Sequence, residues 1–273
     1  MATFDASATF DLCAVDPKRE VIDAKRAEEL LAPLVAAAAF PSGYTRVRLS
    51  NKSLTPDAAK ALAERALAAL ANVVELDISD VIASRPEDDA LQALSAVCGA
   101  FAGRPLVEVN VSDNALGQKG IDACLPVLQE QASLERLYVC NNGLSAAAAE
   151  QLVGLLLFRD GAAAAEPGAP SAPTTLKLLH FFNNMQDDGG AIHIARVVER
   201  SPLLEDFRLS STRCKNDGGV ALGTALGKFH NLRKLEISDN SFGSVGGEAS
   251  CGSAARLCRC AKTLCSCPSL STC

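Results

Sequence analysis

A short pattern of apolar and polar positions recurs along most of this chain. From Val47 onward, apolar residues alternate with polar ones for a few positions, and an Asn or a replacement for it follows at a fixed place. We call the residues at this place the slot residues: Lys52, Val81, Asn114, Asn142, Asn184, Thr212 and Asn240. Their spacings are 29, 33, 28, 42, 28 and 28 residues. Such self-similarity predicts a repeat architecture in which each period is one structural unit.

Each period predicts one short strand and one helix. Leu137 and Val139 alternate with polar residues as in a strand, whereas residues Ser145 to Phe158 have apolar positions at helical spacing. Ser145 and Thr55, the latter followed by Pro56, are suited to cap such helices. Stacked repeats bury one aliphatic core, in which each large side chain contributes about 1.5–3 kcal/mol.

The recurring form L-x-L-x-x-N-x-L, with substitutions, is typical of leucine-rich repeats. The predicted fold class is therefore α/β: a leucine-rich repeat horseshoe solenoid of the long-repeat type, similar to ribonuclease inhibitor. Parallel strands are expected on its concave face and helices outside. The slot asparagines are expected to point into the stack and to bond turn backbone groups of their own and the adjacent coil: Asn114, Asn142, Asn184 and Asn240. Lys52, Val81 and Thr212 lack this amide, which predicts weaker coils there.

The repeats divide the chain into three predicted parts. Residues 1–43, with a helical pattern from Asp23 to Leu34, are expected to cap the first coil. Residues 44–247 hold about seven repeats, and residues 248–273 form a Cys-rich, irregular tail. This division predicts one repeat domain between two atypical ends.

Two stretches depart from the repeat pattern. The longest spacing contains DGAAAAEPGAPSAP, residues 160–173, whose Ala, Gly and Pro content predicts a flexible surface excursion. Near the end, Ala261 to Leu270 has the pattern of the last part of a repeat helix, and the chain stops where an eighth strand would begin. This end predicts an uncapped coil and a frayed C-terminus.

Composition narrows the class of protein. The chain is 48% hydrophobic and only 4% aromatic, which suits an aliphatic solenoid better than an enzyme with aromatic pockets. The longest apolar run, Leu30 to Phe40, contains Pro33 and is too short to span a bilayer. No secretory signal pattern begins the chain. The net charge of −6 argues against nucleic acid and favours a basic protein partner. We expect a soluble, intracellular monomer.

No group of residues in the sequence predicts a catalytic site. The three histidines, His180, His193 and His230, fall on different repeats or faces, and we expect His180 to be a solvated strand residue. No H-E-x-x-H and no G-x-x-x-x-G-K-[ST] motif is present. Six cysteines crowd the tail, and two C-x-C pairs among them could bind zinc or copper(I) through thiolates. The tail has no histidine and no C-x-x-C pair, so we predict no metal site and no cofactor.

Polar residues dominate the positions that could meet a partner. Strand alternation places these side chains on the concave face: Arg48, Asp77, Asn110, Tyr138, His180, Arg208 and Glu236. Directly before each slot stands a short polar residue, and we call this set the rim residues: Asn51, Asp80, Asp113, Asn141, Asn183, Ser211 and Asp239. They either form tight turns or line a docking surface for a basic protein, and both interpretations stay open.

The amino-acid sequence of several repeats resembles that of the Ran GTPase-activating protein family, especially its plant-type members. The resemblance extends over roughly residues 20–247 and is carried by VSDNALGQKGI (Val111 to Ile121), LERLYVCNNGLS (Leu134 to Ser145), the segment from Phe181 to Arg213 and SDNSFGSVGG (Ser238 to Gly247). It implies a regulator without a catalytic site of its own that accelerates GTP hydrolysis by the small GTPase Ran in nucleocytoplasmic transport. The expected partner is Ran in its GTP form, which itself would bind GTP and Mg²⁺. The implied location is the cytoplasm, with the nuclear envelope as a further site.

The resemblance also implies roles for individual residues. Many GTPase activators insert an arginine finger, but this family is thought to use an asparagine that holds the glutamine of Ran where it orients the attacking water. By motif, that residue is Asn141 in CNNGL. Arg85, in a lengthened early loop, matches a docking or positioning arginine. Asp113 and Asn183 are further docking candidates, chosen from their rim positions.

The chain departs from the family pattern in three respects. Members typically have about four further repeats and a strongly acidic C-terminal region, and both are missing from this sequence. Plant members also carry an N-terminal targeting domain rich in a W-P-P motif, whereas this chain has no tryptophan. Two functions therefore compete. One is a Ran GTPase activator, and the other is a non-catalytic leucine-rich repeat scaffold that binds another protein.

Overall fold

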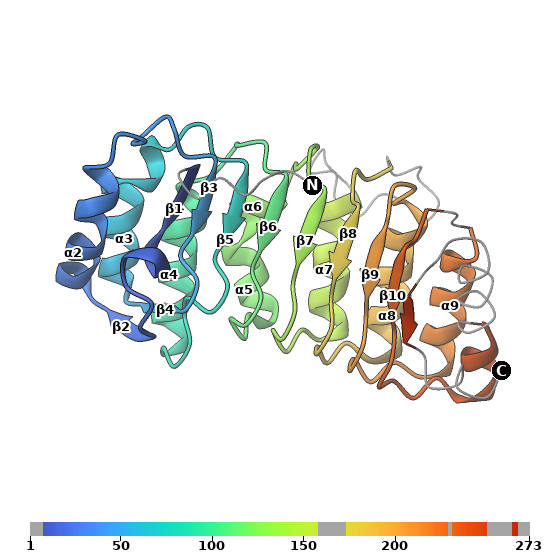
Figure 1. Ribbon diagram of the computed structural model, residues 1–273. Helices are drawn as coiled ribbons and strands as arrows, with labels where there is room; N and C mark the ends of the chain where they lie inside the picture. The colour runs from blue at the N-terminus through green and yellow to red at the C-terminus, as the bar shows by residue number, and fades with distance from the viewer. Residues whose placement is uncertain (1–7, 158–172, 229–230, 250–263, 267–273) are drawn as a thin grey trace. The chain divides into compact units, whose positions relative to one another are not determined.

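The computed structural model describes residues 8–157, 173–228, 231–249 and 264–266 (Figure 1). They fall into two compact units. Unit 1 contains Met1–Asn114 and Asp122–Leu128, and unit 2 contains Ala115–Ile121 and Gln129–Cys273, so the chain passes between the units three times, once within helix α5 (Gly117–Ala123). Residues 160–172 of the predicted excursion and most of the Cys-rich tail lie outside the described residues.

Unit 1 has a parallel sheet with strand order β1-β3-β5-β6. The strands are β1 (Thr9–Asp11), β3 (Arg46–Arg48), β5 (Glu75–Asp77) and β6 (Glu108–Asn110). A second sheet pairs β2 (Glu20–Ile22) with β4 (Lys52–Leu54). The helices are α1 (Leu12–Val15), α2 (Ala24–Val35), α3 (Pro56–Arg65), a 3₁₀ turn (Leu67–Ala69), α4 (Glu87–Gly99) and α6 (Leu125–Leu128).

The N-terminal segment does more than the predicted cap. Its helix α2 occupies nearly the expected range and begins where the Asp23 carboxylate accepts the N–H of Arg26 at 2.8 Å. The same segment also adds a strand to the sheet, because β1 pairs in parallel with β3 and sets Phe10 beside Val47. Both side chains are fully buried. The segment is therefore structurally a first, atypical coil, which the sequence pattern missed because it lacks the recurring motif.

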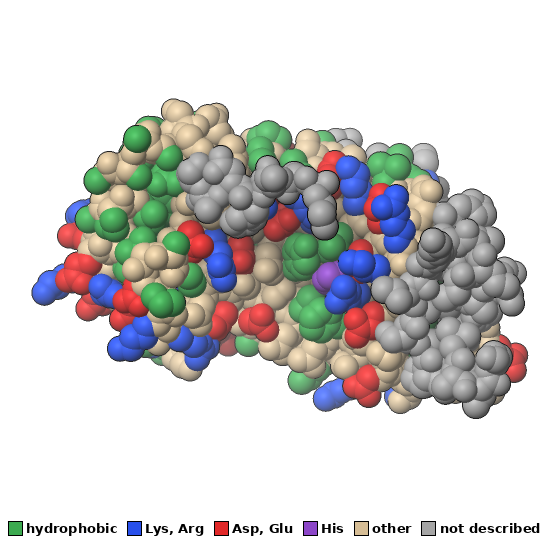
Figure 2. Space-filling view, viewed as in Figure 1, with side chains coloured by type: hydrophobic (Ala, Val, Ile, Leu, Met, Phe, Trp, Pro, Cys, Tyr) green, Lys and Arg blue, Asp and Glu red, His purple; other side chains and the backbone are tan. Residues whose placement is uncertain are grey.

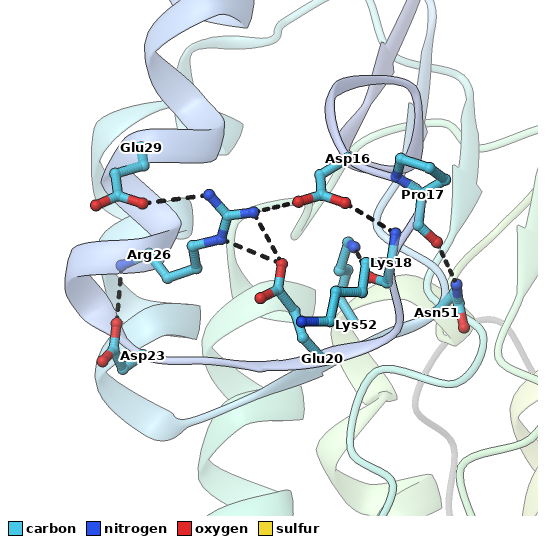
Figure 3. A network of polar contacts seen from close by, with 9 residues as sticks. All are labelled: Asp16, Pro17, Lys18, Glu20, Asp23, Arg26, Glu29, Asn51 and Lys52. Carbon is cyan, nitrogen blue, oxygen red and sulfur yellow. Dashed lines mark hydrogen bonds and ion pairs between the residues drawn. The ribbon is translucent and has the colours of Figure 1, made fainter.

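A polar network lies within this segment and also joins it to the first regular coil (Figure 3). The guanidinium of Arg26 bonds the carboxylates of Asp16, Glu20 and Glu29, and its Nε lies 3.1 Å from Glu20 Oε1. Slot residue Lys52 is fully buried, and its Nζ donates to the carbonyl of Lys18. The slot lysine thus bonds the backbone of the preceding coil.

Unit 2 has a parallel sheet with strand order β7-β8-β9-β10-β11. Its strands are β7 (Arg136–Tyr138), β8 (Leu178–His180), β9 (Asp206–Arg208), β10 (Lys234–Glu236) and β11 (Leu264–Ser266). Helices α7 (Ala146–Leu157), α8 (Asp187–Glu199) and α9 (Asn216–Leu226) lie behind the strands, and α8 packs against both of its neighbours (Figure 1).

Strand β11 corrects one prediction. The stretch from Ala261 to Leu270 was expected to end a helix, yet Leu264–Ser266 pairs in parallel with β10, with Cys265 opposite Leu235. A short apolar run does not by itself distinguish a strand from a helix. Here the open edge of β10 supplies backbone hydrogen-bond partners, which favour the strand.

Regular burial and capping explain why the repeats form these elements. Alternate strand residues such as Leu137, Val139 and Leu179 are buried, with at most 1% exposed. Ser145 Oγ accepts the N–H of Ala148 at 3.3 Å, and Thr55 caps α3 in the same way at 3.2 Å from Ala58 N. The chain has the predicted α/β leucine-rich repeat fold, with parallel strands on one side of each unit and helices on the other.

Candidate functional site

The slot asparagines set the positions of the site residues, because they bond the turn backbone of two coils. Asn184 is 1% exposed, and its Oδ1 accepts the N–H groups of Asn142 and Leu144 at 3.1 and 3.2 Å. Its Nδ2 donates to the carbonyls of Val139 and Phe181 at 2.9 and 3.2 Å. One buried amide therefore bonds its own turn and the turn one coil earlier.

Asn114 and Asn240 make the same kind of cross-coil bond. Asn114 Oδ1 accepts the N–H of Val81 at 2.9 Å, and Asn240 Oδ1 accepts the N–H of Thr212 at 3.1 Å. The backbone N–H groups of these two substituted slots are thus bonded by the following coil. That the coils are weaker at the substituted slots stays a prediction.

All seven rim residues have left-handed backbone conformations. Their φ angles lie between 51° and 63°, at Asn51, Asp80, Asp113, Asn141, Asn183, Ser211 and Asp239. Asn and Asp adopt this region more readily than other non-glycine residues, because their short polar side chains bond locally. The backbone therefore accounts for the composition of the rim, while the side chains still point outward at several positions.

Asn141 and Asn183 are the rim residues that the structure brings together. Both are exposed, and Asn183 Nδ2 donates to Asn141 Oδ1 at 2.8 Å. The neighbouring slot residue Asn142 is 1% exposed. Backbone direction therefore separates the two consecutive asparagines, one facing outward and the other into the stack.

Arg85 and Asp113 lie in unit 1. Arg85 stands in the extra turn before α4, where its N–H bonds the carbonyl of Ile82 at 3.1 Å. Its side chain is half-buried, and its Nε is buried without a hydrogen-bond partner among the described residues. Asp113 is exposed. Arg85 is thus partly packed against its own unit and does not extend fully from its loop.

The guanidinium of an arginine bonds one of the rim carboxylates, and the sequence did not predict this contact. Arg19 donates from Nε and Nη2 to the two carboxylate oxygens of Asp80, at 2.9 and 2.8 Å. Asn51 Nδ2 donates to the carbonyl of Pro17 at 3.3 Å, which Figure 3 shows. The segment from Pro17 to Arg19 therefore covers the first two rim positions. No sequence motif pointed to this contact, because 61 positions separate Arg19 from Asp80.

His180 corrects a second prediction, since it is buried and not solvated. It is 8% exposed, and its Nε2 lies 3.0 Å from Asp206 Oδ1. The ring of Tyr138 meets it edge-on at 5.1 Å between centroids. Asp206 and Arg208 share one face of β9, and Arg208 pairs with His180 in the strand register. Strand alternation places Asp206 on the same face as Arg208 and could have predicted this cluster, but Asp206 is not among the candidate residues of the sequence analysis.

The electrostatics of this cluster favour a neutral histidine. Burial lowers the pKa of His180, and this outweighs the raising effect of Asp206. Burial raises the pKa of Asp206, but bonds from Arg208 and His180 outweigh it and leave that pKa below its usual value. A carboxylate only accepts hydrogen bonds, so the neutral imidazole carries its proton on Nε2. The cluster therefore links side chains of neighbouring strands and has a structural role.

Charges of both signs are interspersed over the strand face that Figure 2 shows. In unit 2, Lys177 Nζ pairs with Glu135 at 2.7 Å, and Arg208 Nε lies 3.2 Å from Asp206. In unit 1, Arg46 pairs with Glu75. This mixture does not favour the acidic docking surface for a basic protein that the net charge suggested.

The described residues contain neither a cluster of metal-ligating side chains nor a helix that could span a membrane. No group of three or more His, Cys, Asp or Glu side chains there is arranged to hold a metal ion. None of the helices among the described residues has the length and apolar character needed to cross a bilayer.

The fold and a match to a family model define the class of protein to which the chain belongs. A family model described as Leucine Rich repeat matches residues 230–249, and the repeating strand–helix units agree with it. The chain is a leucine-rich repeat protein.

Three relatives of known name match part of the chain. RAN GTPase-activating protein 1 of Arabidopsis thaliana is 39% identical over 135 residues, which are 50% of this chain and 24% of the relative. RAN GTPase-activating protein 2 of the same plant is 43% identical over 122 residues, 44% of this chain and 22% of the relative. Ran GTPase-activating protein 1 of Saccharomyces cerevisiae is 26% identical over 204 residues, which are 72% of this chain and 49% of the relative. Over the matched residues the chain is similar to these Ran GTPase-activating proteins, as the resemblance predicted.

These matches span only part of each relative. The chain matches about a quarter of the length of the two Arabidopsis relatives and about half of the yeast relative.

Proposed function

We propose that this chain stimulates GTP hydrolysis by Ran. In this proposal Asn141 holds the catalytic glutamine of Ran, and the chain supplies no arginine finger. GTP and Mg²⁺ would be bound by Ran, and the chain would act as a monomer on the cytoplasmic pool of Ran-GTP, including that at the nuclear envelope. The names of the relatives and the resemblance of the CNNGL repeat support the choice of partner.

The observation that carries the proposal is the outward position of Asn141 beside an inward Asn142. The outer residue is exposed, and its backbone N–H bonds the carbonyl of Phe182 at 3.1 Å, so its turn is held to the next coil. A neutral amide on a rigid turn can position another amide without moving a proton or forming a covalent bond. Such preorganised positioning accelerates reactions because the partner loses little further entropy at the transition state.

Arg85 is assigned a supporting role. An arginine finger must reach the transferred phosphoryl group, whereas this side chain is half-buried against its own unit. We propose that it contacts Ran near the loop before α4 and orients the complex. Asp113 is proposed as a second contact, because it is an exposed rim residue.

Single-turnover hydrolysis by GTP-loaded Ran tests the proposal. The expected result is stimulation that saturates with the concentration of the chain. Asn141→Gly retains the left-handed backbone and removes the amide. It should lower the saturated rate about 100-fold, as loss of one preorganised hydrogen-bonding group does elsewhere. The concentration for half-saturation should change less than about threefold, because most of the interface would remain.

Ser211→Gly provides the matched control, since Ser211 is another rim residue with a φ of 54°. Its saturated rate should stay within about twofold of the original chain. A chain that gives no stimulation at any concentration would favour the scaffold function instead. Equal rates for Asn141→Gly and the original chain would leave the activator function standing but remove Asn141 from it.

A further inference from the structure

We infer that Asn183 is a positioning residue for Asn141: it selects which end of the Asn141 amide faces the partner. The inference rests on the proposed function and goes beyond it. Sequence reasoning gave Asn183 a different role, as a docking contact chosen from its place on the rim. The geometry points instead to an action through its neighbour.

The two backbones are held before their side chains meet. Asn141 N–H bonds the carbonyl of Phe182 at 3.1 Å, and Asn183 N–H bonds the carbonyl of Ser210 at 2.9 Å. Their φ angles are 52° and 56°. Each Cα is therefore fixed on its own turn, and the two amides extend from fixed positions on the rim.

The bond between the side chains favours one of the two orientations that the Asn141 amide can take. The oxygen and NH₂ ends of an amide are nearly alike in shape but opposite in hydrogen bonding. Asn183 Nδ2 donates to Asn141 Oδ1 at 2.8 Å, which favours the orientation with this oxygen toward Asn183. The NH₂ end of Asn141 is then directed away from Asn183.

Orientation matters because the proposed target is also an amide. A contact between two amides requires each donor to face an acceptor. If the Asn141 amide were reversed, donors would oppose donors and the glutamine of Ran would not be held. A bond that fixes the orientation beforehand therefore acts on the rate of hydrolysis more than on the affinity for Ran.

Other rim positions show that side-chain contacts along the rim are specific to each coil. Ser211 Oγ donates to Asp239 Oδ2 at 2.7 Å, so that a hydroxyl and a carboxylate take the places of the two amides. Asp80 is bonded instead by Arg19. The amide pair is thus a feature of these two coils and does not follow from the repeat alone.

The decisive variant is Asn183→Asp, which keeps the shape of the side chain and exchanges the donor for an acceptor. A carboxylate at this place would attract the NH₂ end of Asn141 and reverse its amide. We expect the saturated rate of hydrolysis by Ran to fall about 10- to 100-fold, a loss typical of small misplacements of a reacting group. The half-saturating concentration should change less than about threefold. Asn183→Gly removes the bond without adding charge, and its rate should fall between those of the original chain and Asn183→Asp.

Ser211→Asp adds the same charge to the neighbouring rim position, which has a φ of 54°, and should leave the rate within about twofold. The same Asn183→Asp change in the Asn141→Gly background should have less than about a twofold further effect, because no amide remains to be oriented. Equal effects in both backgrounds, or a change in half-saturation alone, would overturn the positioning role. In either case stimulation by the original chain would leave the proposed function intact. No stimulation by the original chain would overturn both.

Discussion

The side-chain oxygen of Asn184 lies 3.1 Å from the backbone nitrogen of Asn142, which precedes it by 42 positions. This bond joins two successive turns of unit 2 and is buried on both sides, since each residue is 1% exposed. Because Asn142 is held inward, the residue before it is presented outward on the rim. The geometry of the candidate site therefore depends on a buried amide that takes no part in the proposed contact with Ran.

Removal of this amide should destabilise the chain strongly. Asn184→Ala leaves several buried backbone groups without partners, and each such group costs about 1–3 kcal/mol. We expect the free energy of unfolding to fall by about 3–5 kcal/mol in chemical denaturation. Asn183→Gly is the matched control, because it changes an exposed neighbour and should alter stability by less than about 0.5 kcal/mol. Similar losses for the two variants would contradict the structural role of the slot amide.

Two helical glycines should respond in opposite directions to substitution by alanine. At Gly218 in α9, an added Cβ would lie 2.5 Å from the Sγ of Cys214 and 2.8 Å from the Cβ of Ala191, so Gly218→Ala should cost about 1–3 kcal/mol. At Gly154 in α7, no atom of the described residues lies within 4 Å of the added Cβ, and Gly154→Ala should stabilise by about 0.4–1 kcal/mol. Thermal unfolding of both variants checks the pair. A destabilised Gly154→Ala would contradict the open space beside this position of α7.

Stability should depend on pH through His180. Its pKa in the folded chain is lowered, chiefly by burial, whereas an unfolded histidine has a pKa of about 6.5. As the pH falls below about 6.5, the unfolded chain takes up a proton before the folded chain does, so stability declines. The decline continues until the pH passes below the lowered pKa of the folded state. Above about 6.5 this histidine has no such effect.

Urea denaturation at pH values between 8 and 5 measures this dependence. His180→Gln should flatten the part of the curve just below pH 6.5, because glutamine does not titrate. His193→Gln serves as a control for the other described histidine, which lies 3.9 Å from the Glu150 carboxylate. If the two variants and the original chain share one pH profile, burial of His180 does not control its protonation.

Local patterns were enough to predict the repeat fold and much of the placement of its strands and helices. Alternation identified the strands around Leu137 and Leu179, and helical spacing identified α7 to within one or two residues. Such predictions succeed because each depends on residues that lie a few positions apart. The inward slot and the outward rim could be distinguished for the same reason, although the left-handed backbone of the rim was not foreseen.

Contacts between distant segments were predicted less well. The strand β1 joins the sheet without the repeat motif, and β11 forms where a helix end was expected. His180 was expected to be solvated because alternation directs it outward, but Tyr138 and Asp206 cover it from the adjacent strands. Burial of a side chain depends on the neighbours that surround it in space, and single-chain periodicity does not specify the size or charge of those neighbours.

The sequence by itself determined that this chain folds into stacked strand–helix coils, because the apolar spacing recurs in each coil and a slot asparagine in four of the seven. It also identified Asn141 as the candidate contact through the resemblance of one repeat. Only the tertiary structure decided that Arg19 lies on Asp80 and that Asn183 bonds Asn141. These side-chain bonds join residues 61 and 42 positions apart, and they form only after the stacking of coils has brought the rim residues within hydrogen-bonding distance.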